Sequence, residues 1–155
     1  MQQPTPEYTF YLQALNTLLK EGHSVRIKAG GRSMQPFIEP DRDELVLTPG
    51  GEYAAGDIVL ADVGGGRAVI HRILRIEGKQ VTLQGDGNVG QQEHCRTDDI
   101  HAKLTAIVHP TRTVDTDSRS FRLRSRLWTS LIPLRRYLLA LYRRWPGKKK
   151  GLHDQ

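Results

Sequence analysis

The sequence predicts a mainly β protein, in which one folded sheet or partly open barrel lies between an N-terminal helix and an amphipathic helical tail. Short apolar runs separated by glycines extend from residue 25 to residue 110, as in a sheet built from hairpins. Apolar residues recur at helical spacing before this region, and leucines and arginines do so after it. We therefore predict a β domain with its helix over residues 1–111 and a basic helical tail over residues 112–155.

The first predicted element is a helix that begins after Thr5 and ends near Gly22. Thr5 supplies a capping hydroxyl, and Pro6 suits the first helical position because its φ angle is already helical. Aromatic residues and leucines at steps of three and four residues form one apolar stripe along this helix: Tyr8, Tyr11, Leu15, Leu18 and Leu19. The stripe predicts that the helix packs on the domain.

The β region follows the helix. Strands are predicted over residues 25–29, 44–48, 57–63, 68–76, 80–85 and 102–109. Glycine-containing turns at residues 64–66 and 77–79 lie where hairpins need them. A sheet of such short strands can bury its apolar face by curving strongly or by closing into a partly open barrel.

The strand pattern stops after residue 110. Residues 111–120 are polar and are predicted as a linker. Residues 121–145 are predicted as helix with a break near Pro133, because proline can begin a helix but disrupts its interior. The second helical piece has one apolar face, formed by Leu134, Leu138, Leu141, Tyr142 and Trp145. Its other face is predicted to hold the arginines Arg135, Arg136, Arg143 and Arg144.

Composition narrows the class of protein. With 37% apolar and 26% charged residues, the chain is too apolar for a disordered protein and too polar for a membrane bundle. The single cysteine, Cys95, excludes an internal disulfide and indicates a reducing compartment. Neither a secretory signal nor an apolar stretch of membrane-spanning length is evident, so a cytoplasmic location is expected. The His, Cys and Asp residues between 94 and 101 match no common zinc spacing, so no metal or other cofactor is expected.

Positive charge is concentrated in the tail. Residues 112–150 carry 12 basic and 2 acidic side chains, a net of +10, whereas residues 1–111 have a net of −3. We predict that the tail contacts anionic membrane at its inner face through Arg135, Arg136, Arg143, Arg144 and Trp145. The alternative is a tail whose leucines pack on the body. Nucleic acid is not an expected partner, because no aromatic-rich β surface for base stacking is evident.

Two segments contain residues suited to nucleophilic catalysis. Ser33 follows Gly30 and Gly31 at the end of a predicted strand, on a turn where a hydroxyl can project toward converging N–H groups. His71 lies within another predicted strand, and a neutral imidazole beside a serine hydroxyl can act as a general base. The alternatives are a structural turn serine and a core histidine bonded to a main-chain carbonyl.

The order of four motifs resembles the signal peptidase I superfamily, which includes the self-cleaving SOS and phage repressors. These motifs are Gly31-Arg32-Ser33-Met34-Gln35-Pro36, Gly56-Asp57-Ile58-Val59, Ile70-His71-Arg72-Ile73 and Gly85-Asp86-Gly87-Asn88. The resemblance covers about residues 25–110 and implies a signal-peptidase/repressor-type folded sheet. It implies that Ser33 is the nucleophile and that His71 replaces the lysine base of bacterial members, as in the endoplasmic-reticulum and archaeal branch. It also implies substrate contacts for Met34 and Pro36.

The remaining parts of such a site also have candidates. Asp86 or Glu93 would orient His71, since no aspartate stands a few residues beyond the fourth motif. Several family members carry a hydroxyl at the position of Gly31, where it helps to form the oxyanion hole. Because Gly31 has no hydroxyl, the hole would rest on main-chain N–H groups, those of Ser33 and Gly31.

The predicted function is a serine endopeptidase of signal-peptidase type that cleaves a peptide precursor or leader. An extended substrate would lie along an open sheet edge near Ser33. One alternative is a self-cleaving regulator, but only about 24 residues precede the first strand, too few for a DNA-reading unit. The Ala29–Gly30 bond also lies only four residues from Ser33. Another alternative is a non-catalytic module that binds peptides or a membrane surface.

Overall fold

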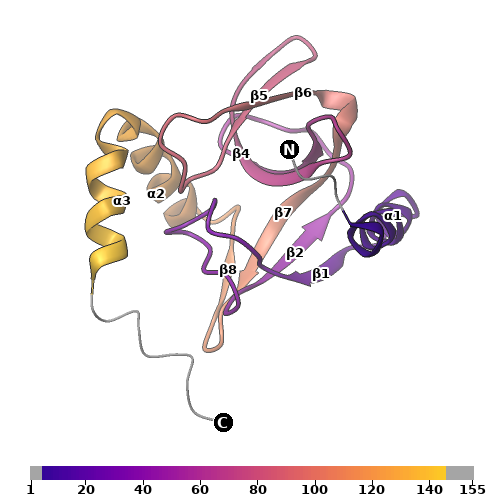
Figure 1. The fold of residues 1–155 in the computed structure, drawn as a ribbon, viewed down its shortest axis with the longest axis horizontal. Coiled ribbons are helices and arrows are strands. Elements are labelled where there is room, and N and C mark those ends of the chain that lie inside the picture. The colour runs from indigo at the N-terminus through magenta and orange to yellow at the C-terminus, as the bar shows by residue number, and fades with distance from the viewer. Residues whose placement is uncertain (1–4, 146–155) are drawn as a thin grey trace.

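The body of the protein is one antiparallel sheet that curls into a half-barrel (Figure 1). The structure is a computed structural model and describes residues 5–145. The strands are β1 (Val25–Lys28), β2 (Glu44–Thr48), β3 (Ile58–Asp62), β4 (Ala68–Glu77), β5 (Gln80–Gln84), β6 (Glu93–Arg96), β7 (Ile100–Val108) and β8 (Thr113–Asp115). The helices are α1 (Pro6–Lys20), α2 (Arg119–Ser130) and α3 (Arg135–Arg144), with short 3-10 turns at Thr97–Asp99 and Ile132–Leu134. This confirms the predicted mainly β fold with a helix before the sheet and helices after it.

The strands lie in the order β1-β2-β7-β3-β4-β5-β6, and β8 pairs with β7. Bulges interrupt the β2–β7, β3–β7 and β4–β5 pairings, and each bulge increases the local twist that curls the sheet. All the predicted strands form, with small shifts at their ends. This order places β6 beside β5. The pairing brings the carboxylate of Glu93, the first residue of β6, to β4.

The residue patterns of the sequence predict neither β6 nor β8. In β6 the buried positions are Glu93 and Cys95 and the exposed ones are His94 and Arg96, so the alternation is present without an apolar run to reveal it. The short strand β8 lies within the segment predicted as a linker. Because β8 pairs with β7, the sheet continues beyond residue 111.

Helix α1 packs against β1 and β7. The Thr5 hydroxyl accepts a hydrogen bond from the main-chain N–H of Tyr8 (3.3 Å), which is the predicted cap. Leu15 and Leu19 are the buried residues of this helix. Tyr8 and Tyr11, which belong to the predicted stripe, remain exposed. Fewer residues of the helix are therefore buried against the sheet than the stripe predicts. The two tyrosines border a cavity.

Two apolar clusters form the core. The larger one joins α1 and α2 to β2 and β7, and it includes Leu15, Leu47, Leu104 and Phe121. The second lies among β3, β4, β5 and β6 and includes Val59. Because alternate residues of a strand point to one face, a single curved sheet can serve both clusters.

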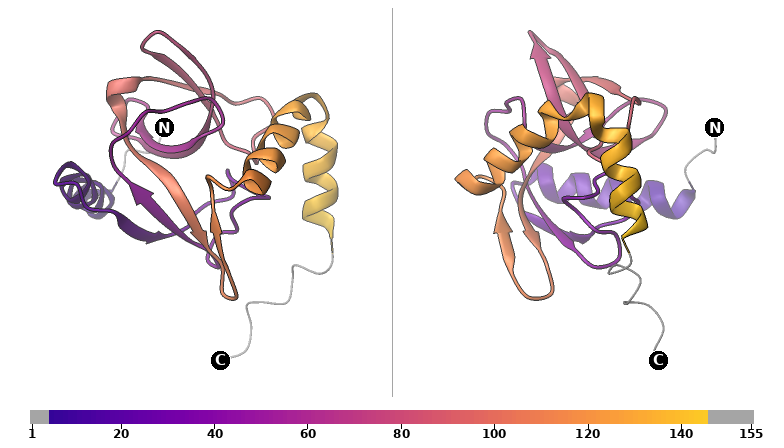
Figure 2. Two further views of the ribbon diagram at one scale, coloured as in Figure 1. Left: turned by 180° about the vertical axis from the view of Figure 1, so that it is seen from behind. Right: turned by 90° about the vertical axis from the view of Figure 1, so that its left-hand side faces the viewer.

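Helices α2 and α3 lie at the opposite end of the molecule from α1 (Figure 2). The chain breaks between them at the turn that contains Pro133, as predicted. The Ser118 hydroxyl caps α2 by accepting a hydrogen bond from the main-chain N–H of Phe121 (3.3 Å). Phe121 itself is buried in the larger cluster, so the start of α2 is fixed to the sheet.

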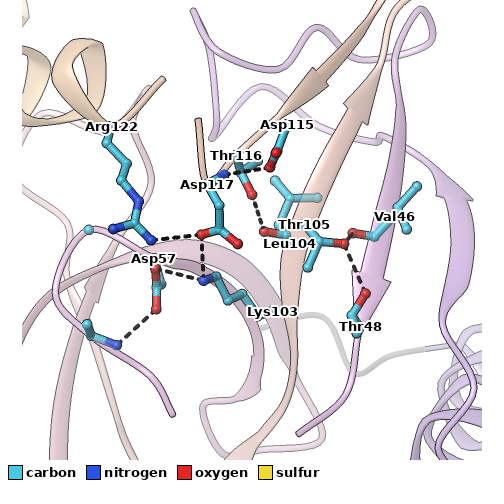
Figure 3. A network of polar contacts seen from close by, with 12 residues as sticks. Val46, Thr48, Asp57, Lys103, Leu104, Thr105, Asp115, Thr116, Asp117 and Arg122 are labelled. Atoms are coloured by element: carbon cyan, nitrogen blue, oxygen red, sulfur yellow. Dashed lines mark hydrogen bonds and ion pairs between the residues drawn. The ribbon is translucent and has the colours of Figure 1, made fainter. Parts of the chain in front are cut away.

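A polar network holds the start of α2 on the sheet (Figure 3). The Lys103 ammonium of β7 lies 2.9 Å from an Asp117 carboxylate oxygen and 3.4 Å from one of Asp57. Asp117 also accepts a hydrogen bond from Arg122 (3.0 Å). Burial would lower the pKa of Lys103, but the two aspartates outweigh it and hold that pKa above its usual range. The network therefore links β7, the turn before β3 and the first turn of α2.

The face of α3 that meets the body differs from the predicted one. Arg135 and Leu139 are the buried residues of α3, whereas Leu134, Leu141 and Trp145 are 53%, 63% and 64% exposed. The prediction that Arg135 belongs to an exposed arginine face is therefore wrong. Helical periodicity divides residues into faces, but packing decides which face turns inward. Within residues 5–145, no helix is both long and apolar enough to cross a bilayer.

Candidate active site

Ser33 lies on the turn after β1, two residues after Gly31 and directly before the buried Met34. Gly31 has a φ angle of 71°, a left-handed conformation that favours glycine. The Ser33 side chain is half-buried and lines a cavity of about 270 Å³, together with Met34. Pro36 instead lines a separate cavity beside Phe37. The structure therefore does not bring Pro36 to the Ser33 cavity, because residues 36 and 37 face the other side of the turn.

His71 lines the same cavity from β4, where it pairs with Val59 of β3. Its side chain is almost fully buried, and its Nδ1 lies 2.8 Å from a carboxylate oxygen of Glu93 at the start of β6. Arg67 lies 3.7 Å from the other oxygen of Glu93. A carboxylate at Nδ1 holds the ring tautomer that leaves Nε2 free to accept a proton.

The Nε2 atom of His71 points toward Gly85, next to the Ser33 main chain. A Cβ atom added to Gly85 would lie 3.1 Å from His71 Nε2 and 2.4 Å from the Ser33 carbonyl oxygen. The expected hydrogen bond between the Ser33 hydroxyl and His71 is not formed among the contacts of residues 5–145. Catalytic hydrogen bonds are often loose without substrate and tighten when substrate binds.

Asp86, the other candidate for orienting His71, is bound elsewhere. Its two carboxylate oxygens accept hydrogen bonds from Arg72 Nε (2.8 Å) and Nη2 (2.7 Å), and both side chains are 1% exposed. Arg72 also donates to the carbonyl of Gly56 (2.9 Å). Successive residues of a strand point to opposite faces, so a carboxylate held by Arg72 lies on the other face of β4 from His71. The structure thus places Glu93, and not Asp86, on His71.

Main-chain N–H groups are available beside Ser33. Among the residues that the structure describes, the N–H groups of Gly31 and Ser33 donate to no hydrogen-bond acceptor. The Ser33 carbonyl, in contrast, accepts a hydrogen bond from the main-chain N–H of Gly87 (2.7 Å). Free donors on a glycine-containing turn can bind the negative oxygen of a tetrahedral intermediate.

The cavity lies between two unpaired strand edges. Among residues 5–145, β1 pairs only with β2, and residues 68–71 of β4 pair only with β3. Helix α1 reaches one of these edges, where the Tyr8 hydroxyl donates to the carbonyl of Ala68 (3.4 Å). Tyr11 and Leu12 of α1 also line the cavity. An extended peptide can bind such edges through main-chain hydrogen bonds.

Sequence reasoning gave no role to Lys28, which the structure places in the cavity wall at the end of β1. Its side chain is exposed, and it stands five residues before Ser33. The available signal was its position on the strand that leads directly into the serine turn. Both Lys28 and His71 line the cavity, so a test of the catalytic base has to distinguish the effect of one from that of the other.

Cys95 does not compete with Ser33 as a nucleophile. Burial raises the pKa of its thiol to about 11, and the charges of Asp99 and Asp62 act in the same direction. The thiolate is the reactive form of cysteine, so this side chain stays protonated and unreactive at neutral pH. The nearby His101 is engaged by Asp62, with 2.9 Å between its Nε2 and the carboxylate.

Comparison with known protein families finds a match over residues 2–109 to the family described as Peptidase S24-like. No curated protein matches the sequence. The matched region includes α1, Ser33, His71 and Glu93 and ends just after β7, so that β8, α2 and α3 lie beyond it.

Proposed function

The chain belongs to the Peptidase S24-like family, and from this premise we propose that it is a serine endopeptidase that cleaves a peptide precursor or leader. The observation that carries the proposal is the cavity shared by Ser33 and His71, with Glu93 bound to the far nitrogen of the imidazole. This arrangement supports a Ser–His pair of the kind found in the endoplasmic-reticulum and archaeal signal peptidases.

In this proposal the Ser33 hydroxyl attacks the scissile carbonyl while His71 Nε2 takes its proton. The N–H groups of Gly31 and Ser33 bind the oxygen that becomes negative. His71 then returns the proton to the leaving amine, and water hydrolyses the acyl-enzyme. Glu93 stabilises the imidazolium that forms between these two steps. The substrate lies extended along the free edges of β1 and β4, with its side chains against the α1 wall.

The test labels the purified full-length protein with a fluorophosphonate, which reacts with activated serines whatever their natural substrate. We expect one adduct, at Ser33, and none in Ser33→Ala. General-base catalysis contributes about 100-fold or more, so His71→Gln should label at least that much more slowly. Lys28→Gln should label like the unchanged protein, because its exposed ammonium is not the base. Equal rates for His71→Gln and the unchanged protein, or labelling away from Ser33, would refute the Ser–His assignment.

Self-cleavage is the other activity that the family supports. The Ala29–Gly30 bond borders the same cavity as Ser33, but it is joined to the serine by a short turn. Incubating the purified protein alone and measuring intact mass distinguishes the two activities. We expect an intact chain and cleavage of added peptides only. Fragments that form at a rate independent of protein concentration would favour the self-cleaving regulator.

We further propose that the outer face of α2 and α3 binds an anionic membrane surface, at the inner face of the membrane. Six large apolar side chains of α2, α3 and the residues that flank α3 are more than half exposed: Leu123, Leu127, Leu134, Tyr137, Leu141 and Trp145. Exposed arginines adjoin them: Arg122, Arg124, Arg136 and Arg144. Arg143 is exposed as well, but its guanidinium donates a hydrogen bond to the carbonyl of Gly87 on the body. An exposed apolar group beside a cluster of cations is complementary to anionic lipid headgroups over an acyl layer. Arg135 is not part of this surface, because it is buried.

Vesicle sedimentation tests the membrane surface. The full-length protein should pellet with vesicles that contain phosphatidylglycerol and not with phosphatidylcholine alone, and salt should weaken the binding. Each arginine near an anionic bilayer contributes about 1 kcal/mol, so the double variant Arg136→Glu/Arg144→Glu should reduce the bound fraction at least about fivefold. Phe10→Glu is the control, since Phe10 is 73% exposed on α1 at the other end of the molecule. Equal binding of the double variant and the unchanged protein would refute the proposal.

A further inference from the structure

The loop of residues 85–88, between β5 and β6, lies against both members of the proposed catalytic pair, Ser33 and His71. Gly87 donates its main-chain N–H to the Ser33 carbonyl, and Gly85 lies between that carbonyl and His71 Nε2. A Cβ atom on Gly87 would lie 2.4 Å from the Arg32 carbonyl oxygen. The position of this loop therefore sets the separation of the serine turn from β4.

All four carbonyl groups of the 85–88 loop accept hydrogen bonds from side chains of the C-terminal helices. Trp128 Nε1 donates to the carbonyl of residue 86 (3.0 Å), and Arg143 Nη2 donates to that of residue 87 (3.2 Å). Arg135 Nη1 donates to the carbonyls of residues 85 and 88, each at 3.3 Å. The guanidinium carbon of Arg135 also lies 5.3 Å from the centre of the Trp128 ring. These donors all lie beyond the region matched to the peptidase family.

Arg135 is a costly residue to bury. Its side chain is 1% exposed, and within residues 5–145 its Nε and Nη2 have no hydrogen-bond partner. Burial lowers the pKa of Arg135, and the charge of Asp86 only partly opposes this effect. An apolar side chain would fill the same space without a desolvation penalty. What the arginine adds is the pair of hydrogen bonds that joins the two ends of the loop.

We propose that Arg135 and Trp128 are positioning residues that hold the 85–88 loop against Ser33 and His71. The C-terminal helices are then part of the catalytic apparatus of this chain, although they lie outside its family domain. The inference rests on the proposed peptidase function. It assigns the inner face of α2 and α3 to the active site, whereas their outer face is the proposed membrane surface.

The test compares Arg135→Leu and Trp128→Phe with the unchanged full-length protein. Arg135→Leu removes both loop hydrogen bonds and keeps an apolar filling, whereas Trp128→Phe removes one donor and keeps an aromatic ring. Arg126→Leu is the matched control, because Arg126 is exposed on α2 and makes no hydrogen bond to the loop among the described residues. Three quantities are measured for each protein: fluorophosphonate kinetics at Ser33, thermal stability and hydrogen exchange of residues 84–92.

We expect the maximal labelling rate, kinact, to fall at least about tenfold in Arg135→Leu, because small displacements of reacting groups slow reactions strongly. The probe's KI should change less than twofold, labelling should still reach completion, and exchange of the loop should accelerate. The thermal midpoint of Arg135→Leu should not fall, since a buried charge is removed. Trp128→Phe should show smaller changes in the same direction, and Arg135→Lys should recover part of the lost rate.

Incomplete labelling with an unchanged kinact would overturn the inference, because it would show only a loss of folded protein. Unchanged kinact and unchanged loop exchange in both variants would do the same. If Arg135→Leu does not fold, Trp128→Phe carries the test. If the unchanged protein does not react at Ser33, the proposed function fails. Hydrogen exchange of residues 84–92 in the variants then tests by itself whether the helices hold the loop.

Discussion

At the scale of single residues, the His71–Glu93 contact is the most consequential one. A carboxylate on Nδ1 keeps the ring's other nitrogen unprotonated and stabilises the cation formed during proton transfer. Glutamine at position 93 can donate to Nδ1 and so place the proton on the wrong nitrogen. We expect Glu93→Gln to slow fluorophosphonate labelling of Ser33 about 100-fold or more. Glu77→Gln, at a 73% exposed side chain, is the control; a Glu93→Gln rate equal to the control's would contradict the assignment.

Gly87 shows how close the 85–88 loop comes to the serine turn. A methyl group there would meet the Arg32 carbonyl oxygen at 2.4 Å, and a main-chain atom cannot move aside cheaply. We expect Gly87→Ala to lower the free energy of unfolding by about 1–3 kcal/mol, as overpacking does. Gly90→Ala is the matched control, since nothing lies within 4 Å of its added Cβ. Urea denaturation of both variants tests this, and equal stabilities would show that the loop can yield.

At the scale of elements, the buried Arg72–Asp86 pair joins β4 to the 85–88 loop. Removing one partner leaves an uncompensated buried charge, so we expect Arg72→Met to cost about 3–5 kcal/mol of unfolding free energy. Arg75→Met provides the comparison: Arg75 lies 3.7 Å from Glu77 with a 61% exposed side chain, and such pairs contribute about 1 kcal/mol or less. Urea denaturation measures both costs. A cost for Arg72→Met no larger than that for Arg75→Met would mean that other contacts hold the loop.

At the scale of the whole molecule, acid should destabilise the fold partly through Asp43. This buried carboxylate lies 2.7 Å from His109 at the end of β7 and accepts hydrogen bonds from Arg42 and from the main-chain N–H of Glu39. Burial by itself would raise the pKa of Asp43, but these hydrogen bonds outweigh it and hold the pKa below its ordinary value of 3.8. The contact therefore links the segment after the serine turn to the residue that follows β7.

A folded-state pKa below the unfolded one means that protonation favours unfolding. The stabilisation by Asp43 is thus fully present above its unfolded-state pKa and is lost as the pH falls through its folded-state pKa. We expect the free energy of unfolding, measured by urea denaturation between pH 2 and pH 6, to decline toward the acid end. Asp43→Asn should be less stable near neutral pH and should show a flatter decline. Parallel curves for the two proteins would exclude Asp43 as a source of the acid sensitivity.

The sequence by itself determined the order of the motifs and every helix and strand except β6 and β8. Strand alternation, glycine turns, the Thr5 cap and the break at Pro133 depend on residues close together in the chain, and each appears in the structure as predicted. Ser33 and His71 could be singled out for the same reason. Each lies in a short segment whose neighbours indicate a turn or a strand.

Only the tertiary structure decided which distant residues meet. Glu93 reaches His71 because β6 pairs with β5, and Asp86 is held on the opposite face of β4 by Arg72. The rotation of α3 about its axis buries Arg135 and exposes leucines. The helical periodicity by itself is equally consistent with the leucines facing the body. The physical reason is the same in each case. The packing of the whole core sets the order of the strands and the rotation of each helix. That packing depends on residues far apart in the chain, so a short stretch of sequence cannot reveal it.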